Sequence, residues 1–159
     1  GLAHTHYYGG VARVQNSTLR NCTYGVRVEN YTRRNGALEL DNLSRFTNCE
    51  FSTTSTFPNG LYDQPRVHAT VTNVRGITFT NCRFLNTDPG LFQDTRRGRG
   101  IQAFNAGFKV LGNDDPNTAR FENLSIGVVA FCWPLRPYTV DRMHFVDNML
   151  GVYDVTSIA

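Results

Sequence analysis

The stretch Phe79-Thr80-Asn81-Cys82-Arg83-Phe84 decides the fold, because close copies of it recur along the chain. The shared pattern is apolar, any residue, Asn or Asp, two further residues, then apolar. It occurs at residues 19–24, 46–51, 79–84, 121–126 and 145–150. The Asn or Asp positions are 27, 33, 42 and 24 residues apart. The shorter spacings suit one coil of a β-solenoid with three short strands, and the longer ones predict inserted loops.

The composition favours strands and tight turns over helices. The 159 residues include 15 Asn, 17 Thr and 14 Gly, and no sustained apolar spacing of three and four residues predicts an amphipathic helix. A hydrophobic content of 40% excludes wholesale disorder. No apolar run approaches the roughly 18 residues of a membrane span. A net charge of +3 is too small to indicate a nucleic-acid partner.

The repeated Asn predicts a bend flanked by two inward apolar residues, since Asn tolerates the left-handed conformation. Stacked coils would then form one hydrogen-bonded ladder. The predicted ladder contains Asn21, Asn48, Asn81, Asn123 and Asp147. The apolar residues before the bend would form one inner aromatic column, made of Phe46, Phe79, Phe121 and Phe145.

The cysteines share the repeat and are expected to be free thiols. Cys22, Cys49 and Cys82 all follow the repeated Asn, so they should stack in one column as small buried hydrophobes. Cys132 lies outside this pattern. No Cys-x-x-Cys pair occurs, so we expect no metal site.

The repeated phrase resembles the coils of right-handed parallel β-helix proteins of the pectate-lyase-like superfamily. It is also similar to repeats of long bacterial surface and secreted proteins. The resemblance covers roughly residues 10–156 and implies a three-sheet solenoid with stacked Asn and aromatic side chains. We expect an all-β, right-handed parallel β-helix of about five to six coils. Residues 1–159 would form a single β-helix segment of a longer chain, with inserted loops at about 52–66 and 86–100.

Two short motifs resemble those of polygalacturonase-type glycoside hydrolases, which share this fold. They are Asn86-Thr87-Asp88 and Gly112-Asn113-Asp114-Asp115. In that family the acids protonate the leaving oxygen and activate water. The resemblance makes Asp88, Asp114 and Asp115 catalytic candidates. The alternative is that they are turn-forming residues, because the histidine and Arg-x-Lys motifs of that family are absent.

A basic run supplies the first ligand-binding candidates. Arg96, Arg97 and Arg99 could bind an acidic sugar or a phosphate through bidentate contacts. We expect no cofactor. Pectate lyases use an arginine base with calcium held by Asp residues, so the resemblance makes calcium the alternative. The alternative is a mobile solvated loop, since glycines interrupt the run.

An aromatic and basic cluster supplies the second candidates. Trp133, Arg136 and Tyr138 lie between and beside prolines. Aromatic rings can stack on sugars while arginine bonds their hydroxyl groups, although the same rings can simply cover a solenoid flank.

The regular repeat and the incomplete catalytic set favour a non-catalytic module. We expect a rigid stalk or an adhesive, glycan-binding surface in a bacterial secreted or cell-surface protein, located outside the cell. Its partners would be further β-helix coils of the same or another chain, and polysaccharide. The alternative is a polysaccharide lyase or glycoside hydrolase, or a fragment of one, acting on acidic polysaccharide.

Overall fold

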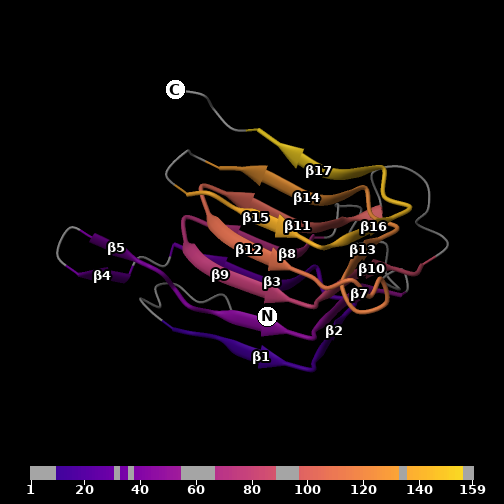
Figure 1. Cartoon of the computed structure of the whole chain (residues 1–159), viewed down its shortest axis with the longest axis horizontal. Coiled ribbons are helices and arrows are strands. Elements are labelled where there is room, and N and C mark those ends of the chain that lie inside the picture. The colour runs from indigo at the N-terminus through magenta and orange to yellow at the C-terminus, as the bar shows by residue number, and fades with distance from the viewer. Residues whose placement is uncertain are drawn as a thin grey trace.

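The computed structural model contains three parallel five-stranded β-sheets and one antiparallel hairpin (Figure 1). It describes residues 10–30, 33–35, 38–54, 67–88, 97–132 and 136–155. These ranges contain no α-helix, and hence no helix of the length and hydrophobicity that crosses a membrane. The arrangement is all-β and consistent with a parallel β-solenoid.

Apart from the hairpin, every third strand joins the same sheet. Sheet A contains β1 Arg13–Gln15, β6 Arg45–Thr47, β9 Arg75–Thr80, β12 Gly107–Leu111 and β15 Thr139–Asp141. Sheet B contains β2 Thr18–Arg20, β7 Glu50–Thr53, β10 Arg83–Asn86, β13 Arg120–Glu122 and β16 His144–Val146. Sheet C contains β3 Tyr24–Glu29, β8 Val67–Thr72, β11 Arg99–Phe104, β14 Ile126–Phe131 and β17 Leu150–Asp154. Each run of one A, one B and one C strand forms one round of the chain.

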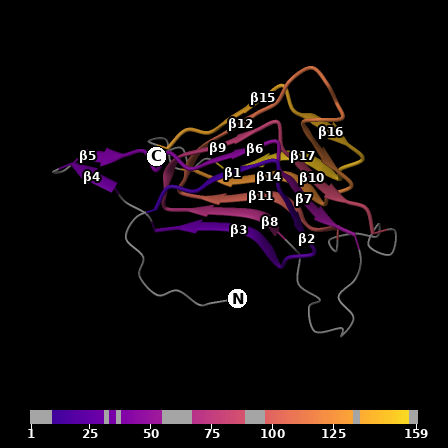
Figure 2. The same ribbon diagram turned by 90° about the horizontal axis from the view of Figure 1, so that it is seen from below.

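The three sheets surround a triangular interior (Figure 2). The hairpin, β4 Arg33–Asn35 and β5 Leu38–Leu40, projects from the edge where sheet C leads into sheet A. It interrupts the connection between β3 and β6, so the second round begins only after this excursion.

Asparagine in the left-handed conformation makes eight of the bends between sheets. Its φ lies between 45° and 54° after strands of all three sheets. The residues are Asn16, Asn48 and Asn81 after sheet A, Asn21 and Asn123 after sheet B, and Asn30, Asn73 and Asn105 after sheet C. Most other side chains are strained at such φ values, which explains the high asparagine content.

The predicted single ladder is divided between two edges of the molecule. Asn48 and Asn81 follow strands of sheet A, whereas Asn21, Asn123 and Asp147 follow strands of sheet B. All five residues do have positive φ, from 50° to 54°. Both edges need a left-handed residue between two inward apolar side chains, so the same phrase suits either edge.

Side-chain amides bond from one round to the next at these edges. At the edge from sheet A to sheet B, Asn48 Nδ2 donates to Asn16 Oδ1 at 3.1 Å. At the edge from sheet C to sheet A, Asn73 Nδ2 donates to Asn30 Oδ1 at 2.9 Å. Asn105 Nδ2 in turn donates to Asn73 Oδ1 at 3.0 Å. Within the described ranges, the ladder of Asn30, Asn73 and Asn105 therefore lies at an edge that the repeated phrase does not mark.

Two phenylalanine columns fill the interior instead of the single predicted column. Phe46 stacks on Phe79 in sheet A, with ring centroids 5.0 Å apart. A second column runs through sheet B, and its neighbouring centroids are 4.7–5.1 Å apart. It contains Phe51, Phe84, Phe121 and Phe145. The columns meet edge to face, as where Phe79 contacts Phe84 at 5.8 Å. Such pairs add stability beyond the burial of apolar area.

Glycine near the start of sheet C strands allows this column to pack closely. A Cβ added at Gly127 would lie 2.6 Å from the carbonyl oxygen of Gly151 and 2.6 Å from Cε1 of Phe145. A Cβ at Gly100 would lie 2.5 Å from Cδ1 of Phe121. The glycine that often ends the repeated phrase thus makes room for a ring of sheet B.

Both predicted insertions fall between a sheet B strand and the following sheet C strand. Their ends belong to strands, since β7 extends to Thr53, β10 extends to Asn86 and β11 begins at Arg99. The remaining parts, 55–66 and 89–96, lie outside the described residues.

The Asn73→Ala variant tests the ladder. It loses two amide hydrogen bonds, each contributing about 1 kcal/mol, and places alanine at a φ of 52°, which costs about 1–2 kcal/mol. We expect the free energy of unfolding, measured by urea titration with circular dichroism, to fall by about 2–4 kcal/mol. Asn73→Gly tolerates the left-handed backbone and should recover about 1 kcal/mol of this loss. If the free energy of unfolding of Asn73→Ala equalled that of the wild type, the result would contradict a stabilising ladder.

The Gly127→Ala variant tests the close packing against the Phe145 ring and the Gly151 carbonyl. Overpacking of this kind costs about 1–3 kcal/mol, so thermal and urea unfolding should both shift to lower values. Gly151→Ala is the matched control in the next round, because its Cβ would meet nothing nearer than Cδ1 of Phe145 at 3.4 Å. Equal losses in the two variants would show that this close packing is not the constraint.

Candidate functional site

The three candidate catalytic acids lie at opposite edges of sheet B. Asp88 follows β10 at the edge towards sheet C and is only 7% exposed. Asp114 and Asp115 are exposed in the turn between β12 and β13, at the edge towards sheet A. The length of a sheet B strand, about 10–13 Å, therefore separates the edges that carry them. The structure does not bring Asp88 together with Asp114 or Asp115.

Polar atoms of both motifs are used in turns. Asn113 Oδ1 accepts from the Asp115 amide at 3.0 Å and from Thr118 Oγ1 at 2.7 Å. Asp115 Oδ1 accepts from the Asn117 amide at 2.8 Å. These are the local bonds by which Asn and Asp stabilise turns. Among the described residues, no three His, Cys, Asp or Glu side chains gather into a possible metal site.

The arginine run is only partly described. Arg96 lies outside the described residues. Arg97 Nη1 donates to the carbonyl oxygen of Asp147 at 3.0 Å, and Arg99 Nη1 donates to Gln102 Oε1 at 3.1 Å. Both guanidinium groups thus contact neighbouring parts of the chain on the sheet B and sheet C side.

Arg136 is held by two partners at the edge from sheet C to sheet A. Its Nη2 donates to both carboxylate oxygens of Glu39, at 2.8 and 2.9 Å. Its Nη1 donates to the carbonyl oxygen of Asn105 at 2.8 Å. Arg136 therefore ties the hairpin strand β5 to the body of the molecule, although Glu39 is 97 residues away in sequence. Its predicted partner Trp133 lies outside the described residues.

Tyr138 packs beside the same edge. Its ring stacks on Phe108 with centroids 5.3 Å apart. Burial raises the pKa of Tyr138 to about 12, and the hydrogen bond and charge of Asp154 contribute further. The phenol is therefore neutral at physiological pH, and much of its ring belongs to the packing rather than to an open sugar-binding surface.

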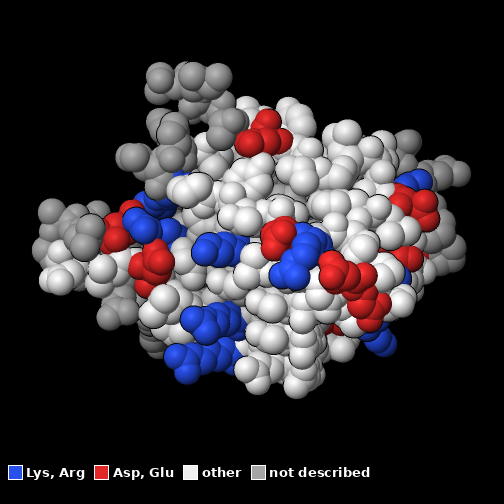
Figure 3. Space-filling view, in the orientation of Figure 1, with Lys and Arg blue, Asp and Glu red and all other residues white. Residues whose placement is uncertain are grey.

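A groove of about 300 Å³ lies over the outer face of sheet A, where sheet C leads into it. Its polar lining consists of Asp41, Arg45, Arg75, Thr78, Lys109 and Arg136. Figure 3 shows Lys and Arg side chains gathered over this face, on the side nearer the hairpin. The groove therefore unites one predicted ligand-binding residue, which precedes β15, with cations from three strands.

The parallel register sets the groove's cations in line. Arg45, Thr78 and Lys109 are direct register partners on β6, β9 and β12. Arg13 on β1 is the next member of this outward column beside Arg45, and it lies outside the groove lining. Such neighbours are spaced by about 4.8 Å per strand.

The sequence carried a signal for this column that our interpretation missed. Arg45 directly precedes the inward Phe46, and Lys109 directly precedes the inward Val110. A basic residue one position before an inward apolar residue of a strand points outward. The members are more than 30 residues apart in sequence, so they form no visible cluster there.

The groove retains positive charge after its internal pairs are formed. Arg75 Nε lies 2.7 Å from Asp41 Oδ1, and Arg136 is paired with Glu39. Within the described part of the chain, Arg45 and Lys109 form no ion pair. Both side chains are exposed, so they are available to an anion from solution.

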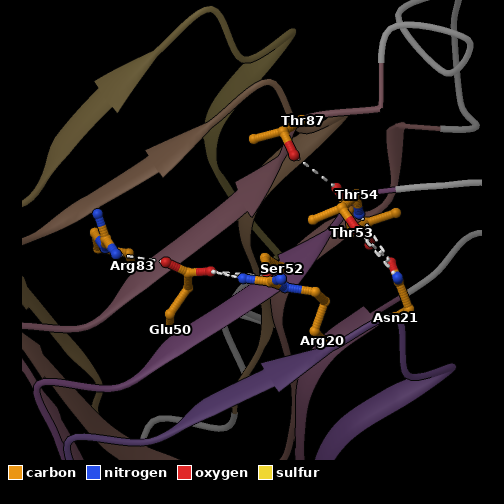
Figure 4. Close-up of polar contacts among 8 residues, drawn as sticks. All are labelled: Arg20, Asn21, Glu50, Ser52, Thr53, Thr54, Arg83 and Thr87. Atoms are coloured by element: carbon orange, nitrogen blue, oxygen red, sulfur yellow. Dashed lines mark hydrogen bonds and ion pairs between the residues drawn. The ribbon is translucent and has the colours of Figure 1, made fainter.

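On the outer face of sheet B, one carboxylate is shared between two arginines (Figure 4). Glu50, whose side chain is 17% exposed, pairs with Arg83 and lies 3.6 Å from Arg20 Nη2. Ser52 Oγ also donates to Glu50 Oε1 at 2.9 Å. The carboxylate thus already has cationic and hydroxyl partners.

At the edge between sheets B and C, threonine residues form the hydrogen bonds between rounds where the first long insertion begins. The amide of Thr54 donates to Asn21 Oδ1 at 2.8 Å, and Asn21 Nδ2 donates to Thr54 Oγ1 at 3.0 Å (Figure 4). Thr87 Oγ1 donates to the carbonyl oxygen of Thr53 at 3.4 Å. Beside the insertion, a side-chain partner of Asn21 is therefore the hydroxyl of Thr54 and not an asparagine amide.

The prediction of free thiols is confirmed, since all four cysteines are unpaired. They do not form one column of three, because Cys49 and Cys82 lie at the edge between sheets A and B and Cys22 lies at the edge between sheets B and C. Burial raises the pKa of the Cys82 thiol to about 12 and also raises that of Cys132. These two thiols remain protonated at neutral pH and are poor nucleophiles.

No protein-family model, no curated protein and no solved structure matches this chain. The structure shows a parallel three-sheet arrangement consistent with a β-solenoid, and the comparisons tie it to no family. A fold of this kind does not determine a function.

Thiol labelling tests the assigned environments. At pH 7.5, N-ethylmaleimide should modify the half-exposed Cys22 first, while Cys82 should react only as fast as the protein unfolds. Peptide mass spectrometry over time distinguishes the sites, and labelling in urea provides the reference in which all sites are accessible. Rapid modification of Cys82 in the native protein would contradict its burial.

Proposed function

We propose that this chain is a non-catalytic module of a bacterial secreted or cell-surface protein. In this proposal a right-handed parallel β-helix of five coils forms a rigid support for an adhesive, carbohydrate-binding surface. The observation that carries the proposal is the in-register stacking of all three sheets around common inner columns. Right-handedness is expected because strand–crossover–parallel strand connections are right-handed in nearly all proteins.

The stacked columns favour a mechanical role. Phe84 and Phe121 are fully buried and stack at 4.7 Å, and asparagine amides bond between successive rounds at the edges. Each round contacts mainly its neighbours, as in other repeat architectures. Stiffness then arises along the whole stack rather than from one site.

The separation of the candidate acids argues against glycoside hydrolysis. Hydrolases need two carboxyl groups about 5–10 Å apart across the scissile bond. Asp88 lies at one edge of sheet B, and Asp114 and Asp115 lie at the other. For the hydrolase alternative, Asp88 is therefore not paired across one bond with Asp114 or Asp115.

The groove over sheet A is the proposed adhesive surface. Arg45 and Lys109 offer charge, Thr78 and Asp41 offer hydrogen bonds to hydroxyl groups, and Arg136 forms one wall. The groove combines cations with the carboxylate of Asp41. The cations suit separate negative groups of a ligand, and the carboxylate can accept hydrogen bonds from its hydroxyl groups.

Further β-helix coils are the proposed protein partner. The inner columns end on residues that are much more exposed than their register neighbours. Phe145 is 37% exposed against 0% for Phe121, and Val152 is 42% exposed against 0% for Val128. A further coil of this or another chain would cover them and satisfy the free edges of β15, β16 and β17.

Retention on glycans and product formation together test this function. The protein should be retained on a panel of immobilised bacterial glycans, and Lys109→Glu should reduce retention because it reverses charge in the groove. Incubation with the same glycans should release no reducing ends or unsaturated uronates beyond the buffer control. Product release that depends on Asp88 or Asp115 would overturn the non-catalytic assignment, and absence of retention on every glycan would overturn the adhesive one.

A further inference from the structure

The groove over sheet A has a charge balance that restricts its ligand. Its lining contains four cations, Arg45, Arg75, Lys109 and Arg136, and one carboxylate, Asp41. Arg75 is paired with Asp41, and Arg136 is paired with Glu39 beside the groove. Two cationic groups, Arg45 and Lys109, remain without an ion pair among the described residues. A ligand that neutralises the groove must therefore carry about two negative charges.

The two uncompensated cations are placed to share one small anion. Arg45 and Lys109 lie on alternate strands of sheet A, with Thr78 between them in the same outward column. Two strand spacings put their backbones about 10 Å apart, and two long side chains can close much of that distance from opposite sides. The Thr78 hydroxyl lies between them as a neutral donor.

The size and rim of the groove exclude a long polyanion as the best fit. A volume of about 300 Å³ lies at the lower end of ligand sites. Asp41 lines the groove, and the Glu39 carboxylate lies against Arg136 in its wall. A chain of closely spaced phosphates would meet both carboxylates, whereas a compact ligand with hydroxyl groups could donate hydrogen bonds to them.

We propose that the groove binds a phosphate monoester carried by a small, hydroxyl-bearing molecule such as a sugar phosphate. The phosphate lies between Arg45 and Lys109 and accepts from Thr78, and the hydroxyl groups of the ligand face Asp41. A phosphate monoester carries about −1.5 to −2 charges at pH 7, which matches the two uncompensated cations. A sugar carboxylate carries only one. This assignment rests on the proposed function, in which the same groove is the adhesive surface.

Calorimetric titration of the whole chain at about 0.15 M ionic strength, where the Debye length is about 8 Å, tests the assignment. The probes are glucose 6-phosphate, inorganic phosphate, glucuronate and glucose. The variants Lys109→Gln and Arg45→Gln each remove one groove cation and leave an exposed polar side chain. Arg13→Gln is the matched control, since Arg13 occupies the same outward column on β1 but does not line the groove.

The expected result is saturable binding of one glucose 6-phosphate per chain. Its affinity should fall at least about tenfold in each groove variant, because a charge-assisted contact is lost, and less than about threefold in Arg13→Gln, where only distant charge is removed. Glucose should not bind measurably. Inorganic phosphate that binds as tightly as glucose 6-phosphate would support the phosphate site and identify the free anion as its ligand.

Three results would overturn the phosphate assignment. They are no saturable binding of either phosphate probe, glucuronate binding as tight as that of glucose 6-phosphate, or equal losses in Arg13→Gln and the groove variants. Glycan retention separates this failure from failure of the proposed function. If the glycan panel still retains the wild-type chain and loses it with Lys109→Glu, the groove remains the adhesive surface and only the ligand class is wrong.

Discussion

The left-handed bend at asparagine is the constraint on which the rest of this molecule depends. Each bend, with φ near 50°, sets the residue at which one strand ends and the chain turns towards the next sheet. Because successive rounds bend at equivalent positions, side chains fall into register, and the rings of Phe84 and Phe121 stack at 4.7 Å. The same register leaves glycine beside the rings and sets Arg45 and Lys109 in one outward column. Core packing and surface charge therefore share one origin.

Much of the architecture can be predicted from the repeated phrase, but the phrase cannot tell one edge from another. An apolar side chain, a left-handed asparagine and a second apolar side chain are what any bend between two short parallel strands requires. Asn48 and Asn21 satisfy this requirement equally at different edges. The ladder through Asn30, Asn73 and Asn105 escaped notice because its flanking residues do not repeat the phrase.

The candidate site was predictable only in part, for a different physical reason. Arg136 stood out because proline and aromatic residues flank it, yet its partner Glu39 belongs to a hairpin 97 residues earlier. Arg45 and Lys109 are brought together by the pairing of β6 with β9 and of β9 with β12, although they are far apart in sequence. Charge balance in the groove depends on which cations are already paired, and pairing is a property of the folded chain. By contrast, the motif that contains Asn113 and Asp115 suggested a catalytic site, but these residues form the hydrogen bonds of a turn.

The central claim is the register of the rounds, and scalar couplings across hydrogen bonds measure it most directly. In an isotopically labelled sample, the account predicts coupling from the amide nitrogen of Asn21 to the carbonyl carbon of Ser52, whose oxygen lies 2.8 Å away. It likewise predicts coupling from Asn48 to Thr80 and from Asn123 to Val146. Coupling of the Asn21 amide to the carbonyl of Thr47 or Asn48 would instead place all copies of the phrase at one edge. That result would contradict the two-edge register and the groove built on it.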